Sequence, residues 1–291
     1  MKLTRRHPSI GTEVTAVDLN GPLSEATVAA LKSTWLEHPV LIFPNQALSD
    51  AAHIELARHF GDIEIHPSKS HRSSEHPEIY RVSNVLESGE IMEAPSNDWK
   101  YMQLTWIWHS DSSFREVPSD GSILHGLEVT REGGETLFCN LYDVWDALDA
   151  ERQSELYGLS VNHSHDQILT HTKGLEASKG DDYEALPPVI QPMVRTHPLT
   201  GRKSLFISPH TMSHVVGWSV DRSRKLFESL TTFATQDRFV YRHRWQPDDV
   251  LMWDNRCTMH AVTPYAHEST RRVMHRVTIA GDRPVQAAIP S

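Results

Sequence analysis

The most informative stretch of the chain is Trp108-His109-Ser110-Asp111, which places a histidine and a carboxylate two positions apart. A second run, Trp253-Asp254-Asn255-Arg256, precedes a further histidine, His260. Two histidines and one carboxylate are the ligand set of a mononuclear non-haem Fe(II) site, where three protein ligands leave the other positions open. If His109 and Asp111 lie on a short strand, side-chain alternation puts both on one face. The pattern predicts an oxygenase, provided that His260 reaches the same point.

The histidine content of the chain allows a simpler interpretation. With 19 histidines, a histidine two positions from an acidic residue is expected by chance, and we regard His53-Ile54-Glu55 and His76-Pro77-Glu78 as such accidents. By the same argument, His109-Ser110-Asp111 could be the polar end of a strand whose histidine is hydrogen-bonded. A short motif is only loosely tied to its mechanism. The metal interpretation therefore depends on the rest of the sequence.

The segment Arg271 to Ile279 supplies independent evidence, because its β-branched residues are typical of a strand. On such a strand, Arg272, Met274 and Arg276 share one face. If that face lies inside the protein, two guanidinium groups are buried, and buried charges require partners of opposite charge. A guanidinium matches a carboxylate at two points, so this orientation predicts a pocket for one or two organic acids. The alternative is a solvent-exposed face on which the arginines only solvate the strand.

Four motifs occur in the order and approximate spacing of one family. They are His109-Ser110-Asp111, Gly133-Gly134-Glu135-Thr136, Trp253-Asp254-Asn255-Arg256 followed by His260, and the segment from Arg271 to Arg276. With them the chain resembles the taurine dioxygenase / 2,4-dichlorophenoxyacetate dioxygenase (TauD/TfdA) family of Fe(II)- and 2-oxoglutarate-dependent oxygenases. The resemblance runs from about Ile10 to Pro284. It includes two stretches without evident chemistry, Val194 to Pro198 and Tyr241 to Trp245.

The resemblance implies a metal site and a cosubstrate site. His109, Asp111 and His260 would bind Fe(II), and O₂ would react at the same metal. Thr136 and Arg272 would hold the distal carboxylate of 2-oxoglutarate, whose other end chelates the iron. Taken alone, Thr136 fits a plain β-strand threonine equally well. The carboxylate of Asp111 also favours hydroxylation, because related halogenating enzymes lack it.

The same resemblance implies how the primary substrate is held. Arg276 would face the acidic group of a small anionic organic substrate, and His66 matches a histidine that contacts the substrate anion in the taurine enzyme. The alternative for His66 is a surface-turn histidine before Pro67. Lys69 and Thr105 occupy the positions that recognise the taurine amine, but neither is the expected tyrosine or asparagine. Taurine itself is therefore not the expected substrate.

Two subgroups of the family compete for the substrate assignment. Trp108 to Phe114 and Phe239 to Trp245 resemble the aryloxyacetate enzymes, whereas Ile65 to Pro67 and the segment from Arg271 to Arg276 are closer to the sulfonate enzymes. The leading hypothesis is hydroxylation of an aryloxyalkanoate beside its ether oxygen, giving a phenol and a 2-oxo acid, with succinate and CO₂ as coproducts. The alternative is an alkyl sulfonate or an alkyl sulfate. A small-acid binding protein or a metal hydrolase on the same fold also remains open.

Composition restricts the class of protein further. The 291 residues contain no evident linker, so we expect one domain over residues 1–291. The formal net charge of −10 gives no electrostatic reason to bind nucleic acid. No apolar run predicts a membrane helix or a signal peptide, and two cysteines, Cys139 and Cys257, suit a reducing cytoplasm. The number of subunits is left open, with a homo-oligomer among the options.

Periodicity predicts many short strands and a few helices, which is typical of a mainly β fold with flanking helices. We expect helices at Ser24 to Trp35, Ser49 to Phe60, Tyr142 to Tyr157 and Val220 to Thr235. We expect strands at Gly11 to Leu19, Val40 to Phe43, Ser122 to Val129, Glu135 to Phe138, Arg238 to Arg244, Asp249 to Trp253 and Arg272 to Ala280, with a hairpin of Val189 to Thr196 and Ser204 to Ile207. Segments 83–101 and 166–188 are irregular and are candidate active-site lids. The family resemblance specifies a double-stranded β-helix, or jelly roll.

Overall fold

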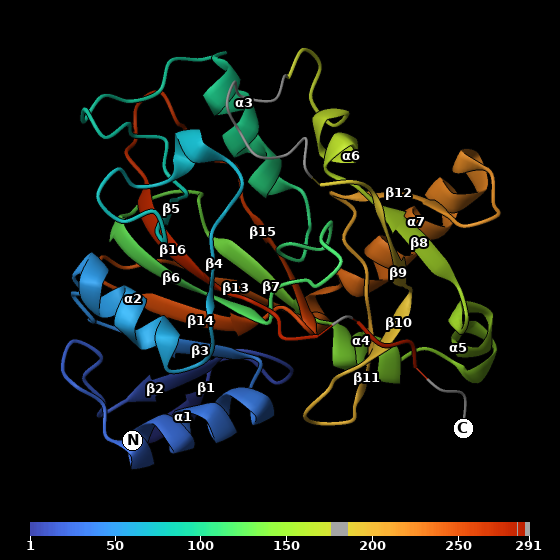
Figure 1. Ribbon diagram of the computed structural model, residues 1–291, viewed down its shortest axis with the longest axis horizontal. Helices are drawn as coiled ribbons and strands as arrows, with labels where there is room; N and C mark the ends of the chain where they lie inside the picture. The colour runs from blue at the N-terminus through green and yellow to red at the C-terminus, as the bar shows by residue number, and fades with distance from the viewer. Residues whose placement is uncertain (176–185, 284, 289–291) are drawn as a thin grey trace.

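The principal sheet of the computed structural model contains eight strands and forms one wall of the molecule (Figure 1). The structure describes residues 1–175, 186–283 and 285–288. Along the sheet the strands are β1 (Lys2–Arg5), β2 (Thr12–Thr15), β3 (Val40–Phe43), β14 (Val250–Asp254), β6 (Gly121–Glu128), β16 (Val273–Ile279) and β4 (Ile63–Glu64), with β5 (Tyr80–Arg81) also on β16. Apart from the parallel pair β2–β3, its pairings are antiparallel.

A second sheet of three strands packs against the inner face of the principal sheet. Its order is β13 (Val240–His243), β7 (Thr136–Asn140) and β15 (Thr258–Val262). Leu124 and Leu251 of the first sheet share one buried cluster with Phe138 of the second. Because strand side chains alternate, the neighbours of these residues point outward. The core between the two sheets is the interior of the predicted double-stranded β-helix.

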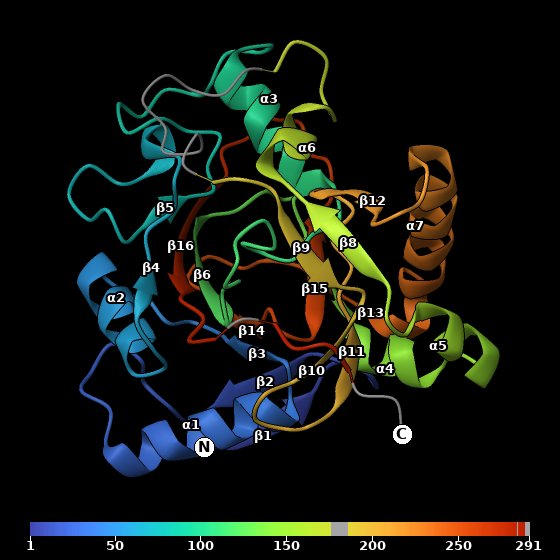
Figure 2. The same cartoon turned by 45° about the vertical axis from the view of Figure 1, so that its right-hand side comes forward.

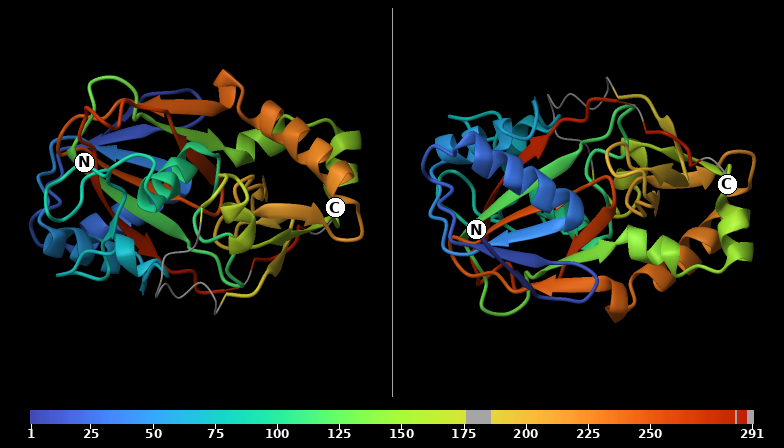
Figure 3. Two further views of the ribbon diagram at one scale, coloured as in Figure 1. Left: turned by 90° about the horizontal axis from the view of Figure 1, so that it is seen from above. Right: turned by 90° about the horizontal axis from the view of Figure 1, so that it is seen from below.

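The outward-facing side chains are covered by helices. Ile123 and Met252 pack toward α1 (Glu25–Glu37) and α2 (Asp50–Arg58), whereas Cys139 and Met259 pack toward α4 (Leu141–Asp146) and α7 (Val220–Ala234). Consequently α1 and α2 lie at one end of the molecule and α7 lies at the other (Figures 1 and 3). Helix α1 starts as predicted, because the hydroxyl of Ser24 accepts from the N–H of Thr27 in its first turn.

Two smaller sheets and the remaining helices complete the structure. Figure 2 shows β8 (Ser160–His163) and β12 (Met212–Val215) beside α7, with α4 and α5 (Ala150–Leu156) below them. The sheets are β12 (Met212–Val215), β8 (Ser160–His163) and β9 (Val189–Pro192), and the hairpin of β10 (Val194–Thr196) with β11 (Lys203–Leu205). The short helices are α3 (Asn97–Gln103), α5 (Ala150–Leu156), α6 (His165–Leu169) and the 3₁₀ turns η1 (Lys69–His71), η2 (Leu104–Trp106) and η4 (Asp237–Phe239).

Several predicted elements have different bounds in the structure. The single helix expected from Tyr142 to Tyr157 is two helices, α4 and α5, because Asp149 caps a new helix by accepting from the N–H of Arg152 at 2.7 Å. The strand expected from Val189 to Thr196 is divided, since its first half pairs with β8 and only its second half forms the hairpin with β11. Strand β15 was not predicted.

The described parts of the two candidate lid segments contain helices that were not predicted. Segment 83–101 contains most of α3, whose first turn is capped by the hydroxyl of Ser96 accepting from Trp99. Segment 166–188 begins within α6, and its residues 176–185 lie outside the described residues. Within the described ranges, every helix is too short or too polar to cross a lipid bilayer.

Candidate active site

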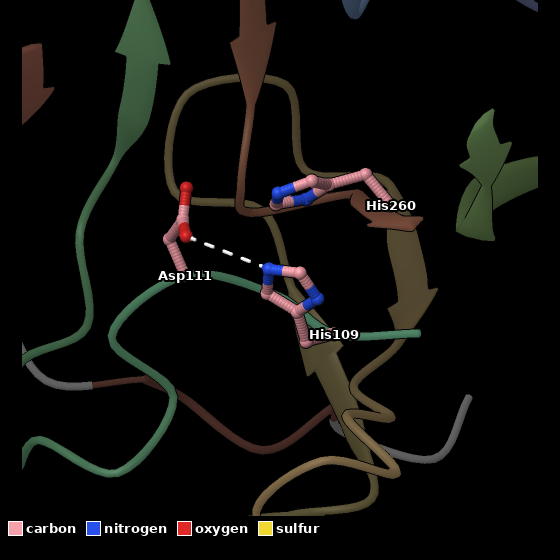
Figure 4. Close-up of side chains that lie close together, drawn as sticks. All are labelled: His109, Asp111 and His260. Carbon is pink, nitrogen blue, oxygen red and sulfur yellow. Dashed lines mark ion pairs between the residues drawn. The ribbon is translucent and has the colours of Figure 1, made fainter. Parts of the chain in front are cut away.

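Three side chains with metal-binding atoms converge between the two sheets (Figure 4). His109 and His260 are joined by an antiparallel bridge in which each backbone N–H donates to the other residue's carbonyl oxygen, at 2.9 and 2.8 Å. The prediction that Asp111 shares a strand with His109 is wrong. Asp111 begins a turn in which Ser112 takes a left-handed φ of 54°. The turn still brings its carboxylate to the histidines, because one ligand atom from each of the three residues lies within 4.8 Å of the others.

The hydrogen bonds and charges around this triad suit metal binding. His109 donates from Nδ1 to the carbonyl oxygen of Ile107 at 2.7 Å, so the lone pair of Nε2 faces Asp111 Oδ1 at 3.9 Å. Burial lowers the pKa of both His109 and His260, which keeps the imidazoles neutral, the form that binds metals. Burial alone would raise the pKa of Asp111, but the charge of Arg276, the two histidines and the hydrogen bond from Ser122 together outweigh it and hold that pKa well below its usual value.

Two arginines adjoin the triad on the β16 segment. Arg272 and Arg276 are both buried and line the same cavity, so the alternative of a solvent-exposed face is wrong. Arg276 donates from Nη1 to Asp111 Oδ1 at 2.6 Å. Arg272 donates from Nε to the carbonyl oxygen of Gly134 at 3.3 Å, but its buried Nη2 has no partner, and no carboxylate of the described residues forms an ion pair with it. A buried guanidinium in this state is suited to an anionic ligand.

The cavity holding these groups is lined by both polar and apolar side chains. Its polar lining includes the triad, the two arginines, Thr136, His66 and His210. Its apolar and aromatic lining comes from Tyr80, Val82, Tyr101, Leu104, Phe114, Leu124, Ile168, Trp253 and Val262. Such a lining suits a small organic molecule that carries both an acidic group and a hydrophobic part.

Most of the remaining predicted site residues reach this cavity. Thr136 is buried on β7, and its Oγ1 accepts from Trp245 Nε1 at 2.9 Å. His66 lines the cavity with its ring 4.0 Å from that of Tyr80, and burial lowers its pKa well below the usual value. Thr105 also lines the cavity, although its hydroxyl donates to the carbonyl oxygen of Met102 at 2.8 Å.

Lys69 is the predicted residue that the structure does not bring to the site. It lies on η1, where its side chain is exposed and outside the cavity lining. Conversely, His210 was not predicted, yet its ring lies 5.2 Å from that of His109 and its buried Nε2 has no partner within the described part of the chain. In a chain with 19 histidines, no local pattern distinguishes His210 from the rest.

Comparison with known proteins places this site in one family. Residues 2–278 match the family described as taurine catabolism dioxygenase TauD, TfdA family. The chain is 37% identical over 282 residues to the alpha-ketoglutarate-dependent 2,4-dichlorophenoxyacetate dioxygenase of Cupriavidus pinatubonensis, covering 95% of this chain and 96% of that protein. It is 32% identical over 288 residues to the (S)-phenoxypropionate/alpha-ketoglutarate-dioxygenase of Sphingobium herbicidovorans, covering 97% and 95%.

A solved structure agrees with these relatives. AAD-2 in complex with Mn(II) and N-oxalylglycine matches with a TM-score of 0.89 and 32% identity, over 98% of this chain and 100% of that chain. The predicted family and the mainly β fold with flanking helices are therefore confirmed. The chain belongs to the taurine catabolism dioxygenase TauD, TfdA family.

Proposed function

We propose that this 2-oxoglutarate-dependent dioxygenase hydroxylates an aryloxyalkanoate at a site in which His109, Asp111 and His260 hold Fe(II). When bound, iron, 2-oxoglutarate and O₂ supply oxidative decarboxylation of the cosubstrate to succinate and CO₂, coupled to hydroxylation. The observation that carries the proposal is the convergence of this triad and two buried arginines in one cavity. The protein's own contribution is to orient both acids and to exclude water.

The guanidinium of Arg272 and the hydroxyl of Thr136 fit the distal carboxylate of 2-oxoglutarate. Its buried Nη2 lacks a partner, and a carboxylate is the anion that a guanidinium binds at two points. Thr136 supports this assignment, because its Oγ1 already accepts from Trp245 and its own proton is free to be donated. A hydrolase or a simple binding protein would not bind 2-oxoglutarate and would not need Arg272 and Thr136 for that purpose.

Arg276 and the apolar lining of the cavity fit the primary substrate. In this proposal Arg276 receives the acidic group, assisted by His66 and by the unpartnered Nε2 of His210, while Thr105 only borders the cavity. The aromatic ring lies against the apolar lining, formed in part by Phe114. Hydroxylation beside the ether oxygen gives a hemiacetal, which collapses to a phenol and a 2-oxo acid. The relatives acting on 2,4-dichlorophenoxyacetate and (S)-phenoxypropionate support this substrate class.

Two helices from the candidate lid segments contribute to the apolar lining. Tyr101 comes from α3 and Ile168 from α6, which supports a role for both segments in enclosing the substrate. The proposal treats residues 1–291 as one domain. It places the enzyme in the cytoplasm, where the free thiols of Cys139 and Cys257 stay reduced.

The test is succinate formation from 2-oxoglutarate with Fe(II) and ascorbate under air. The panel contains aryloxyacetates, aryloxypropionates, alkyl sulfonates and alkyl sulfates, and we expect the first two classes to stimulate turnover. Stimulation only by a sulfonate or sulfate would retain the oxygenase and replace its substrate. His109→Ala and Asp111→Ala should each abolish turnover, and retained turnover in both would overturn the metal assignment.

A further inference from the structure

The turn between β14 and β15 is held by two residues that have no contact with the cavity. Arg195 donates from Nη2 to the carbonyl oxygen of Asn255 at 2.5 Å, and His197 Nε2 lies 3.1 Å from Asp254 Oδ2. Arg256 donates to the same carboxylate from Nε and Nη2, each at 2.8 Å. All five side chains are buried. The stretch around Arg195, which carries no evident chemistry in the sequence, therefore fixes the position of Asn255.

The amide orientation of Asn255 follows from its neighbours. Trp253 Nε1 lies 2.8 Å from Asn255 Oδ1, and an indole nitrogen can only donate, so this atom must be the amide oxygen. The Nδ2 group therefore points the other way, toward Ser119 Oγ at 3.0 Å and Ser122 Oγ at 3.2 Å. Each of its two protons has one acceptor.

The direction of the next hydrogen bond is then determined. Ser122 accepts from Asn255, and it has a single proton, which it donates to Asp111 Oδ2 at 2.7 Å. Ser122 and Asn255 are buried, so water does not compete for either group. Oδ2 is thereby engaged, and Oδ1 is the oxygen that faces His109.

We infer that Asn255 is a positioning residue for the Asp111 carboxylate and acts through the hydroxyl of Ser122. The inference rests on the proposed role of Asp111 as a metal ligand. Arg276 already donates to Oδ1 of this carboxylate, and the relay holds Oδ2, so the carboxylate is ordered at both oxygens before the metal binds. Partners of this kind set the orientation of metal ligands, and their loss costs about 10-fold to 100-fold in metal affinity.

The chain offers a matched pair of variants to test the relay. Ser122→Ala and Ser119→Ala each remove one acceptor of the Asn255 amide, but only Ser122 donates to the side chain of Asp111; Ser119 reaches its backbone oxygen at 3.4 Å. The metal-free full chain is titrated with Mn(II) alone, following the free ion by electron paramagnetic resonance. We expect Ser122→Ala to weaken Mn(II) binding about 10-fold to 100-fold and Ser119→Ala to retain the wild-type affinity.

Asn255→Asp tests the direction of the hydrogen bonds at nearly constant shape. The introduced carboxylate accepts from Trp253 but cannot donate, so it competes with Asp111 for the Ser122 proton. We expect a loss of Mn(II) affinity relative to the wild type, with thermal unfolding of the metal-free protein confirming that each variant is folded.

The outcomes of these experiments distinguish a failure of this inference from a failure of the proposed function. Equal affinity in the wild type and all three variants, or equal losses for Ser119→Ala and Ser122→Ala, would overturn the relay and leave the metal site intact. A wild-type protein that does not bind Mn(II) would overturn the metal assignment, and the relay with it. If Asn255→Asp fails to fold, the two serine variants decide the question.

Discussion

Arg276 Nη1 lies 2.6 Å from Asp111 Oδ1, so a residue expected to bind substrate also contacts an expected metal ligand. Both side chains are almost fully buried, and the guanidinium also lies 4.8 Å above the ring of Tyr80. Its Nε has no partner among the residues that the structure describes. Arg276 thus stands at the boundary between the triad and the cavity. A substrate acid bound to Arg276 would lie close to the metal, where hydroxylation of the adjacent carbon requires it.

Substitution of Arg276 and of Arg272 should affect the binding of different acids, the primary substrate and 2-oxoglutarate. Arg276→Ala should raise KM for the primary substrate more than KM for 2-oxoglutarate, and Arg272→Ala should do the reverse. A hydrogen bond to a charged group contributes about 1.5–3 kcal/mol, so each preferred effect should be roughly 10-fold or larger. Both KM values are measured by succinate formation. Equal effects of each substitution on both acids would contradict this division.

The hydrogen bond from Trp245 to Thr136 should contribute to cosubstrate binding. Trp245 Nε1 donates to Thr136 Oγ1 at 2.9 Å and so leaves the threonine proton for the cavity. Trp245→Phe should raise KM for 2-oxoglutarate about twofold to tenfold, which corresponds to roughly 0.5–1.5 kcal/mol. Thr136→Ser keeps the hydroxyl and should remain close to the wild type, whereas Thr136→Val should not. The hypothesis is wrong if Thr136→Val binds 2-oxoglutarate normally.

Buried histidines should make the protein less stable in acid. Burial lowers the pKa of His53 and of His163 to about 3, from an ordinary value of 6.5. Between these values the unfolded chain binds protons that the folded chain does not, so stability is complete above about pH 6.5 and falls as the pH decreases toward 3. Each histidine should cost about 2 kcal/mol between pH 7 and pH 5.

Urea unfolding at several pH values measures this loss. His53→Gln retains a donor for the carbonyl oxygen of Ile123, which His53 Nε2 approaches at 3.1 Å. The variant should lose less stability than the wild type on acidification, by about the contribution of one histidine. An unchanged pH dependence would show that His53 is not responsible.

The sequence predicts which face a side chain occupies where the alternation of side chains along a strand decides it. Arg272 and Arg276 are both directed to the cavity, as strand alternation requires. Lys69 is different, because it was selected by position alone, and the 3₁₀ turn η1 leaves its side chain exposed. His109 and Asp111 do converge, but through a bridge and a turn instead of the expected strand.

Contacts between distant segments were not predictable in the same way. The pairs Arg276–Asp111 and Asn255–Ser122 join residues 165 and 133 positions apart, and no periodicity relates them. The unpartnered Nε2 of His210 is likewise recognised only once its neighbours are placed. Each of these two pairs joins a strand of the principal sheet to a turn from a distant part of the chain, which single-segment patterns do not encode.

The turn before β7 should depend on a glycine with little free space. Gly133 has a φ of +69°, and a Cβ built there would lie 2.2 Å from the carbonyl oxygen of Pro264, a backbone atom that cannot move independently. Gly158 also has a positive φ, +76°, but nothing lies within 4 Å of its Cβ position. Gly158→Ala therefore controls for backbone strain alone, which costs about 1–2 kcal/mol for a left-handed residue.

Gly133→Ala should reduce the free energy of unfolding by more than Gly158→Ala does, with an added cost of about 1–3 kcal/mol from the clash. Urea unfolding measures this difference. Because Gly134 and Thr136 follow in the same segment, and the carbonyl oxygen of Gly134 accepts from Arg272, the shift should also raise KM for 2-oxoglutarate. Gly158→Ala should leave that KM unchanged. If both variants lose equal stability and keep the wild-type KM, the turn accommodates the methyl group and does not position the cosubstrate residues.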